Sequence, residues 1–397
     1  MATNNNNKAL NVPHLRFPEF TGEWKEYMLS DFVERVKRKN KNNLCKLPLT
    51  ISAQYGLVDQ ISFFNKVIAS ENMSNYYLLH KGDFAYNKSY SSEYPWGAIK
   101  RLDCYEQGTL SSLYICFKPY SHVSSDFLTH YFETSKWHQG ISEIAVEGAR
   151  NHGLLNVGIQ DFFETRHCLP QNLLEQEKIA KFLNLIEERI ATQNKIIEDL
   201  KKLKSAIVDK LYSSTNGETY SFRQLFEVVN EKNKKFVYKN VLSASQEFGM
   251  IERSDINIDI KFEQDSISGY KIVRNGDYVV HLRSFQGGFA FSDRTGICSP
   301  AYTILRPNNL VVYGYLSHFF TSELFIKSLK LVTYGIRDGR SINVDEWLNM
   351  TVTLPNIQEQ VRILTIINAI DAKLHIEIKE QSCLFRQKSY LLNTMFI

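Results

Sequence analysis

The sequence is poor in the residues that mark several protein classes. Its 9 prolines and 19 glycines among 397 residues exclude a collagen-like or proline-rich disordered chain. The six cysteines form no CxxC pair and no metal-ligand spacing with histidine, so we expect buried thiols in a reducing cytoplasm and no metal site. No apolar run approaches the roughly 18 to 20 residues needed to cross a bilayer, and the N-terminus lacks the core of a signal peptide. We therefore expect a cytoplasmic protein without a membrane span.

Catalytic motifs are also missing. The sequence contains no GxxxxGK[ST] phosphate loop, no GxGxxG, no HExxH and no Asn/Asp-Pro-Pro-aromatic string of the kind that adenine methyltransferases use. The formal net charge of +4 permits an anionic partner but is too small to indicate DNA binding by itself. We therefore predict no catalytic residue in this chain.

The chain carries an internal repeat. Residues 34–41 (ERVKRKNK) match residues 227–234 (EVVNEKNK), and 55–58 match 248–251, both at an offset of 193. Further matches pair Gly82-Asp83 with Gly276-Asp277, Lys118-Pro119 with Arg306-Pro307, Leu128–Phe132 with Leu316–Phe320, Gly148–Arg150 with Gly335–Arg337, and Glu175-Gln176 with Glu359-Gln360. The order of the matches is kept while the offset falls to 184, as small deletions in the second copy would make it.

Each copy begins with a globular part. Residues 20–171 and 215–356 contain short β-branched and aromatic runs separated by Gly-Asp, Asn-Gly and proline, which is typical of strands joined by turns. Residues 125–137 and 313–329 have helical spacing. The pattern predicts two α+β domains of mixed, mainly antiparallel strands with helices. Residues 1–19 are expected to be a flexible lead-in.

Each copy ends in a predicted long helix, residues 172–214 and 357–397. Apolar residues recur at alternating steps of four and three, which defines a heptad seam. The seam residues are Ile179, Leu183, Ile186, Ile190, Ile197, Leu200, Ile207 and Leu211 in the first helix and Ile363, Ile367, Ile370, Leu374, Leu384, Leu391 and Met395 in the second. The polar interruptions also correspond, Gln193 with Glu377 and Lys204 with Lys388. An ordinary amphipathic core helix is the alternative, but it does not explain one register kept in two copies.

The order globule, helix, globule, helix predicts an antiparallel coiled coil with pseudo-two-fold symmetry. The helix from Glu175 to Tyr212 would be about 55 Å long at ~1.5 Å per residue. That length corresponds to about one and a half turns of B-DNA. We therefore expect the helices to set the distance between two DNA-reading domains.

Several ordered strings resemble one known family over nearly the whole chain. They are Val12–Phe17, Phe20–Trp24, Asn87–Tyr90, Trp96–Leu102, and the junctions Leu169-Pro170 and Leu354-Pro355 before Glu-Gln and a long helix. Together they resemble the specificity subunits of Type I restriction-modification systems. The second copy departs from the pattern because it lacks a counterpart of Arg16-Phe17-Pro18.

The resemblance implies a non-catalytic subunit with two target-recognition domains, each reading one half of an asymmetric bipartite sequence in double-stranded DNA. It also implies that the helices bind two methyltransferase subunits and that restriction/translocase subunits complete the complex. S-adenosylmethionine, ATP and Mg²⁺ would be bound by those partners and no cofactor by this chain. Two alternatives stay open, namely an enzyme with an unrecognised motif and a coiled-coil adaptor that binds only proteins.

Candidate DNA contacts are chosen for their chemistry, because lysine and arginine bind phosphates whereas arginine, asparagine and glutamine read base edges. They are Lys88, Ser89, Tyr90, Lys100, Arg101, Arg150, Asn151 and His152 in the first copy and Arg283, Ser284, Gln286, Arg337, Asp338 and Arg340 in the second. A further set for nonspecific phosphate contact is the basic run Arg35, Lys37, Arg38, Lys39 and Lys41 with Lys232, Lys234, Lys235 and Lys239. Plain surface turns and a solvated charged face are the alternatives.

Overall fold

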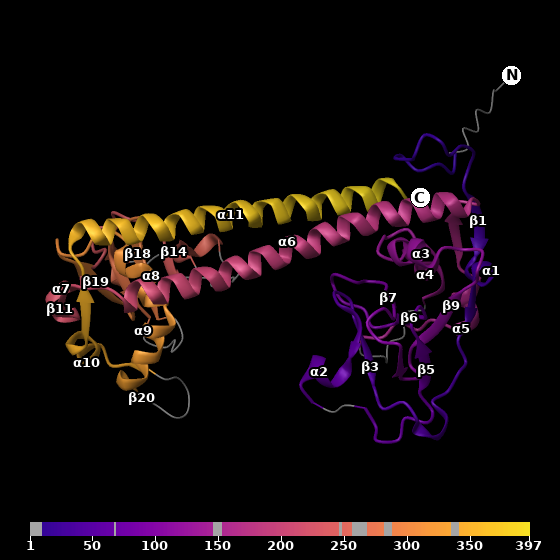
Figure 1. The fold of residues 1–397 in the computed structure, drawn as a ribbon, viewed down its shortest axis with the longest axis horizontal. Helices are drawn as coiled ribbons and strands as arrows, with labels where there is room; N and C mark the ends of the chain where they lie inside the picture. Colours follow the sequence, from indigo (N-terminus) through magenta and orange to yellow (C-terminus); the bar gives the residue numbers. More distant parts are fainter. Residues whose placement is uncertain are drawn as a thin grey trace. The chain divides into compact units, whose positions relative to one another are not determined.

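The computed structural model describes residues 10–66, 69–145, 153–245, 248–255, 268–281, 288–334 and 341–397. These residues form two compact units. Unit 1 contains Met1–Thr192 with Gln381–Ile397, and unit 2 contains Gln193–Glu380. The two long helices are shared, so each unit includes one part of both (Figure 1).

Unit 1 is built around a four-stranded antiparallel sheet with the order β2-β9-β6-β7. Smaller antiparallel pairs are β1 with β10, β3 with β4 and β5 with β8. The strands are β1 (Lys25–Met28), β2 (Val33–Arg35), β3 (Leu49–Ser52), β4 (Gly56–Asp59), β5 (Tyr77–His80), β6 (Phe84–Asn87), β7 (Ala98–Arg101), β8 (Gln107–Leu110), β9 (Ile115–Pro119) and β10 (Arg166–Leu169). The short helices are α1 (Leu29–Phe32), α2 (Gln60–Phe64), α3 (Ser125–Tyr131), α4 (His138–Ile144) and α5 (Ile159–Glu164).

Unit 2 repeats this strand topology and adds one further antiparallel pair, β20 with β21. Its four-stranded sheet has the order β12-β19-β16-β17, and its smaller pairs are β11 with β22, β13 with β14 and β15 with β18. The strands are β11 (Glu218–Ser221), β12 (Phe226–Val229), β13 (Leu242–Ser245), β14 (Gly249–Glu252), β15 (Lys271–Val273), β16 (Tyr278–Val280), β17 (Phe289–Phe291), β18 (Gly296–Cys298), β19 (Thr303–Pro307), β20 (Thr333–Tyr334), β21 (Ser341–Ile342) and β22 (Thr351–Leu354). The short helices are α7 (Phe222–Leu225), α8 (Tyr315–Thr321), α9 (Glu323–Ser328) and α10 (Val344–Asn349).

The central strands β6 and β16 of these sheets are buried on both faces. In β6, Phe84 and Tyr86 join the larger core of unit 1, whereas Ala85 between them joins a second core. In β16, Tyr278 and Val280 join the larger core of unit 2, whereas Val279 joins a second one. Side chains alternate between the faces of a strand. In both strands the first and third residues therefore face the larger core and the residue between them faces the second core.

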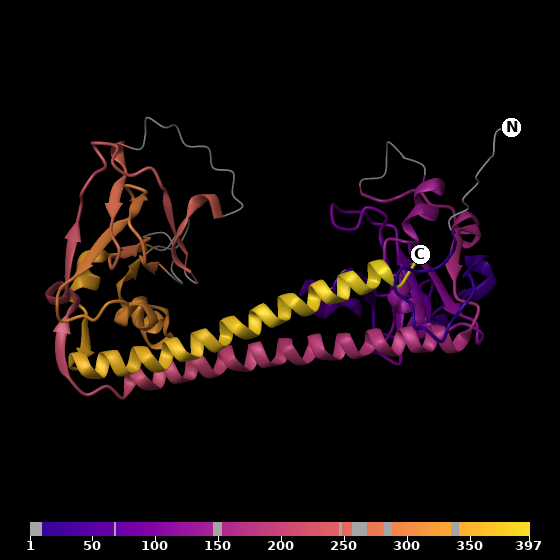
Figure 2. The same ribbon diagram turned by 90° about the horizontal axis from the view of Figure 1, so that it is seen from above.

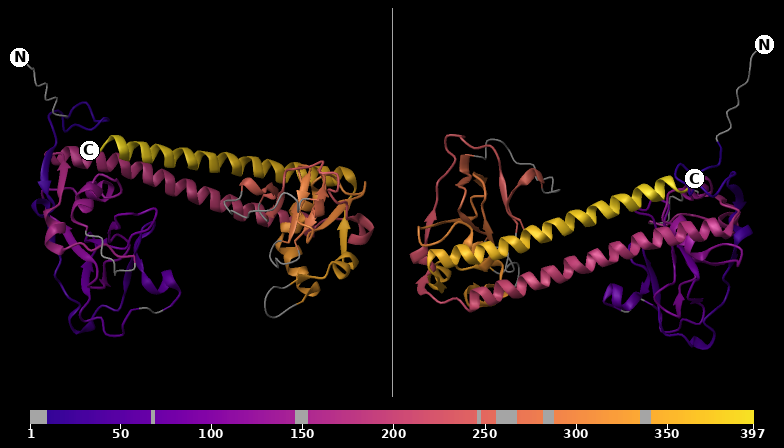
Figure 3. Two further views of the ribbon diagram at one scale, coloured as in Figure 1. Left: turned by 180° about the vertical axis from the view of Figure 1, so that it is seen from behind. Right: turned by 45° about the horizontal axis from the view of Figure 1, so that its top comes forward.

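The two predicted long helices are present as α6 (Leu173–Ser213) and α11 (Ile357–Thr394), of 41 and 38 residues. In unit 1, Ile179, Leu183 and Ile190 near the start of α6 share a core with Leu384, Leu391 and Met395 near the end of α11. In unit 2, Val208 and Tyr212 near the end of α6 share a core with Ile363 and Ile367 near the start of α11. The helices are therefore antiparallel and pack together (Figure 2, Figure 3), which confirms the predicted fold class.

Polar seam residues find partners across the helix pair. In unit 2, the Gln193 amide donates to the Glu377 backbone oxygen at 3.0 Å and to the Glu377 carboxylate at 2.6 Å. The Lys373 ammonium and the Gln193 amide both lower the pKa of Glu377. Lys204 pairs with Asp371 in unit 2, and Lys388 pairs with Glu187 in unit 1. These two ion pairs occupy matching positions at the offset of 184, so the repeat extends to single polar contacts.

The N-terminal lead-in is held against unit 1. The Arg16 guanidinium makes a bidentate ion pair with Glu175, at 2.7 and 2.8 Å, and the Trp24 indole donates to the same carboxylate at 3.2 Å. The Leu15 amide donates to the Thr394 carbonyl at 2.9 Å. Leu15 and Arg16 of the predicted lead-in therefore contact unit 1, and the carboxylate that binds Arg16 lies 159 residues away along the chain.

Candidate nucleic-acid interface

Two of the loops predicted to contact DNA connect the strands of equivalent hairpins, β6–β7 in unit 1 and β16–β17 in unit 2. Each hairpin follows a Gly-Asp turn, in which Gly82 and Gly276 have φ values of 90° and 93°. These left-handed values favour glycine. The aspartates that follow are buried and accept a backbone N–H, Asp83 from His80 at 2.8 Å and Asp277 from Arg274 at 2.8 Å.

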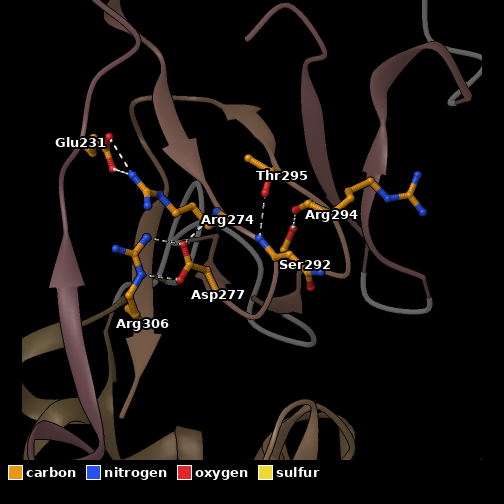
Figure 4. A network of polar contacts seen from close by, with 8 residues as sticks. Glu231, Arg274, Asp277, Ser292, Arg294, Thr295 and Arg306 are labelled. Carbon is orange, nitrogen blue, oxygen red and sulfur yellow. Dashed lines mark hydrogen bonds and ion pairs between the residues drawn. The ribbon is translucent and has the colours of Figure 1, made fainter. Parts of the chain in front are cut away.

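An arginine neutralises each of these buried aspartates. The Asp277 carboxylate accepts hydrogen bonds from Nε and Nη2 of Arg306, each at 2.9 Å, while Arg274 beside it pairs with Glu231 (Figure 4). Asp83 pairs with Arg38. Burial raises the pKa of Asp83, although the His80 N–H and Arg38 act in the opposite direction. These contacts hold the base of each hairpin in place, so the predicted loops extend from a rigid root.

The loop after β6 presents three of the predicted contacts. Ser89 and Tyr90 are exposed, and no described residue pairs with the ammonium of the half-buried Lys88. Gly97 closes the hairpin at φ 78°, where a Cβ would meet the Asn87 carbonyl at 2.1 Å. A cation, a hydroxyl and an aromatic ring therefore lie together on one ordered loop.

This loop is joined to a second predicted stretch. The Leu155 amide donates to the Lys88 carbonyl at 2.9 Å, and the Tyr90 amide donates to the Gly153 carbonyl at 3.1 Å. The segment that directly follows residues 150–152 is thus tied to the Lys88–Tyr90 loop, which is consistent with a shared contact surface.

Lys100 and Arg101 are engaged inside the protein. Lys100 pairs with Glu133, and its side chain is only 12% exposed. Arg101 donates to Asp103 at 2.7 Å and to Asp126 at 2.6 Å, and its side chain is 16% exposed. Since both cations already have carboxylate partners, the geometry favours a structural role for them over phosphate binding.

The other predicted contacts lie outside the described residues. They are Arg150, Asn151, His152, Arg283, Ser284, Gln286, Arg337, Asp338 and Arg340. Their neighbours are placed: the His281 amide donates to the Gly288 carbonyl at 2.6 Å, and β20 pairs with β21 on either side of residues 335–340. Their DNA contacts stay predictions.

Two loops of the basic run share a feature that sequence reasoning missed. The buried Asn40 side chain donates to the Cys45 carbonyl and accepts from the Cys45 N–H, both at 2.9 Å. The buried Asn233 side chain donates to the Tyr238 carbonyl at 2.8 Å and accepts from the Tyr238 N–H at 3.2 Å. Each amide closes a six-residue loop, Asn40–Cys45 or Asn233–Tyr238. Exposed lysines lie in the loop or directly after it, which are Lys41 and Lys46 in unit 1 and Lys234, Lys235 and Lys239 in unit 2. The offset of 193 links Asn40 with Asn233 and Lys46 with Lys239, so the repeat carried the signal that would have added Lys46.

Part of the basic run serves the fold instead. Arg38 pairs with Asp83, and the Lys39 ammonium donates to the Asn75 carbonyl at 2.9 Å and lies 3.8 Å from the centre of the Tyr77 ring. Lys37 and Lys41 are exposed. Phosphate contact from this run is therefore expected mainly from the closed loops.

The described residues contain no group of three or more His, Cys, Asp or Glu side chains that could hold a metal ion. Among the helices placed by the structure, none is long and apolar enough to span a membrane.

The family model for the Type I restriction modification DNA specificity domain matches residues 217–382. Over 96% of its length the chain is 24% identical to the Type I restriction enzyme MjaVIII specificity subunit of Methanocaldococcus jannaschii, of which it covers 93%. A second relative from the same organism, the putative Type I restriction enzyme MjaX specificity subunit, is 24% identical over 56% of each chain.

Two solved structures have a similar fold. A chain from a study of assembly and conformational transition in the type I R-M system gives a TM-score of 0.59 at 15% identity, over 94% of this chain and 97% of that one. The Type-I restriction-modification system S subunit from M. genitalium gives 0.52 at 13% identity, over 97% and 99%. Residues 217–382 thus belong to the Type I restriction modification DNA specificity family, and the whole chain is related to the specificity subunits of Type I restriction-modification enzymes.

Proposed function

We propose that this chain is the non-catalytic DNA-reading subunit of a Type I restriction-modification complex and that it recognises a bipartite, asymmetric sequence in double-stranded DNA. The observation that carries the proposal is the repetition of one strand order in two units, each with a hairpin loop at the same place. Two similar but non-identical readers fit a target with two different halves. The loop sequences differ between the units, Lys88-Ser89-Tyr90 against Arg283-Ser284-Phe285, as two different half-sites require.

The long helices are proposed to bind the partner subunits. Exposed apolar side chains lie along both helices and include Leu185, Leu203, Ile376, Phe385 and Tyr390. Exposed apolar groups gathered on helices favour protein contact. Two methyltransferase subunits would bind here, restriction/translocase subunits would join them, and S-adenosylmethionine, ATP and Mg²⁺ would be used by those partners.

Footprinting of the complex with methyltransferase subunits tests DNA recognition. The proposal predicts two protected tracts separated by an unprotected gap. A single continuous tract would contradict a bipartite target, and no sequence-specific protection would favour a protein-only adaptor.

The enzymatic alternative has a separate test. The purified chain is incubated alone with DNA and labelled S-adenosylmethionine, and then with the methyltransferase subunit added. Transfer of label only in the second reaction is expected. Methyl transfer by the chain alone would overturn the non-catalytic assignment.

The helices are further proposed to set the gap between the half-sites. Inserting seven residues within 194–209 of α6, with a matched insertion in α11, keeps the heptad register and should lengthen the gap while leaving both half-sites unchanged. Altered half-sites with an unchanged gap, mapped by methylation sequencing, would refute this role.

A further inference from the structure

The two units cover the first turns of their long helices differently. In unit 1 the described lead-in lies over the start of α6. Arg16 pairs with Glu175, Glu19 pairs with Lys178, and the Phe17 ring packs edge-on against Phe182 at 5.9 Å. The Lys178 ammonium also lies 4.7 Å from the centre of the Phe17 ring. One short segment thus supplies a cation, an aromatic ring and a carboxylate to three positions of one helical face.

The same three positions of α11 are open in unit 2. At the offset of 184, Glu175, Lys178 and Phe182 correspond to Glu359, Arg362 and Ile366, which we call the α11 entry face. The Glu359 side chain is 41% exposed, whereas that of Glu175 is 3% exposed. Ile366 is 38% exposed, and Val361 and Ile357 beside it are exposed as well. The α11 entry face therefore keeps the acidic, basic and apolar positions of the α6 face, but these positions are exposed.

In unit 2, the described connection between α6 and β11 does not supply such a cover. Only Ser214–Gly217 connect α6 with β11, whereas residues 10–24 of the described chain precede the equivalent strand β1. Gly217 stands where unit 1 has Trp24, and a Cβ at Gly217 would meet the Leu354 carbonyl at 2.1 Å. A cavity of about 350 Å³, lined in part by Gly217, Leu310, Ile357 and Gln360, lies next to this connection. The four-residue connection is thus too short to reach over the first turns of α11.

We infer that the α11 entry face binds an extended peptide segment of a partner protein, one that presents an arginine followed by an aromatic residue and, two residues later, a carboxylate. The arginine would pair with Glu359, the aromatic ring would cover Ile366, and the carboxylate would pair with Arg362. Glu359 is available for this exchange because its present partner is the exposed Arg362 at 3.3 Å. A bidentate arginine is the stronger partner for a carboxylate.

A second copy of this chain is not the proposed occupant. Its own Arg16 is 12% exposed and bound to Glu175, and its Leu15 amide is bonded to Thr394. Release of that lead-in would leave Glu175 buried and unpaired, which is costly. A segment from a different protein carries no such cost. The inference concerns protein contact only and does not rest on the DNA-reading proposal.

The test uses a fluorescent peptide with the sequence of residues 11–23 and the full-length chain, with binding followed by anisotropy. Saturable binding is expected, and Glu359→Gln should weaken it at least about tenfold, as loss of a charge-assisted bidentate pair does. Glu323→Gln is the matched control, because Glu323 is an exposed carboxylate of the same unit that pairs with Lys327. The control variant should bind the peptide as the parent chain does.

A charge-reversed pair of chain and peptide distinguishes loss of the ion pair from loss of folding. Glu359→Arg should abolish binding of the parent peptide and restore binding of a peptide with Arg16→Glu. Absence of saturable binding to the parent chain, or binding unaffected by both changes at Glu359, would overturn the inference. Weakening by Glu175→Gln in place of Glu359→Gln would also overturn it, because the peptide would then be displacing the lead-in of unit 1.

Discussion

Units 1 and 2 share a strand topology but differ in the polar side chains that are buried in them. In unit 1, the buried His167 imidazole lies between the Tyr131 hydroxyl at 2.9 Å and the Thr165 hydroxyl at 2.8 Å. The matching residues of unit 2 are apolar. Strand register equates His167 with Val352, since Tyr27 pairs with the first and Tyr220 with the second. Phe319 and Met350 stand in place of Tyr131 and Thr165.

The features that both units keep are those that the architecture requires. Both units keep the alternation of β6 and β16, the buried aspartate of the hairpin turn and the Lys–carboxylate pair between the helices. They do not keep the histidine network or the Arg16–Glu175 anchor. Packing pattern and turn chemistry therefore specify the fold, whereas the unshared polar groups adjust the stability of one unit.

The largest expected effect is at the anchor of unit 1. Arg16→Ala leaves Glu175 buried without its cation and should destabilise unit 1 by about 3 kcal/mol. Arg362→Ala, at the exposed pair of unit 2, should change stability by less than about 0.5 kcal/mol. Hydrogen exchange resolved by peptide would show faster exchange confined to unit 1 for the first variant. Equal effects of the two substitutions would mean that the units do not differ in this way.

Acid should destabilise unit 1 through His167. Burial lowers the pKa of His167 to about 3, whereas an unfolded histidine has a pKa of about 6.5. Below pH ~6.5 the unfolded chain binds a proton that the folded chain does not, so stability falls by about 1.4 kcal/mol per pH unit down to the folded pKa. Urea unfolding of unit 1 measured between pH 7.5 and 5 checks this slope.

Copying unit 2 into this position sharpens the test. The combined change Tyr131→Phe, Thr165→Met and His167→Val should remove the slope that His167 contributes. His130 and His318, whose pKa values burial lowers in both units, remain as a shared background. An unchanged pH profile in this variant would refute the assignment to His167.

The matching helix contacts should behave alike. Lys388→Met and Lys204→Met each remove one ion pair between α6 and α11, with Glu187 and Asp371 respectively. Because both pairs are partly exposed, each loss should cost about 0.5 kcal/mol or less. A difference above about 1 kcal/mol between the two variants, measured by thermal unfolding, would break the equivalence of the two positions.

The smallest expected effect concerns DNA. Lys88→Ala should weaken binding of the assembled complex and reduce the slope of log affinity against log salt by about 0.9, as loss of one phosphate contact does. Lys100→Ala is the control with an internal partner, Glu133, and should leave the slope unchanged. The same loss of slope in both variants would show that exposure and pairing do not separate DNA contacts from structural cations.

The sequence predicts much of the fold, but it does not predict the partners of the charged residues. The heptad spacing predicted α6 and α11, and the repeated Gly-Asp turns located both hairpins, because these features depend on local pattern. Lys100 and Arg101 are predicted as DNA contacts from their chemistry alone, and that chemistry does not show that Glu133 and Asp126, 33 and 25 residues away, bind them in the fold. A sequence shows that a charge exists, whereas only the fold shows what neutralises it.

Methylation sequencing of a domain exchange tests the central claim most directly. Residues 20–171 are replaced by the matching segment of a related specificity subunit, and modified sites are mapped across the host genome. The account predicts that one half-site changes while the other half-site and the gap are kept. A change in both half-sites, or in neither, would contradict the division of DNA reading between two repeated units.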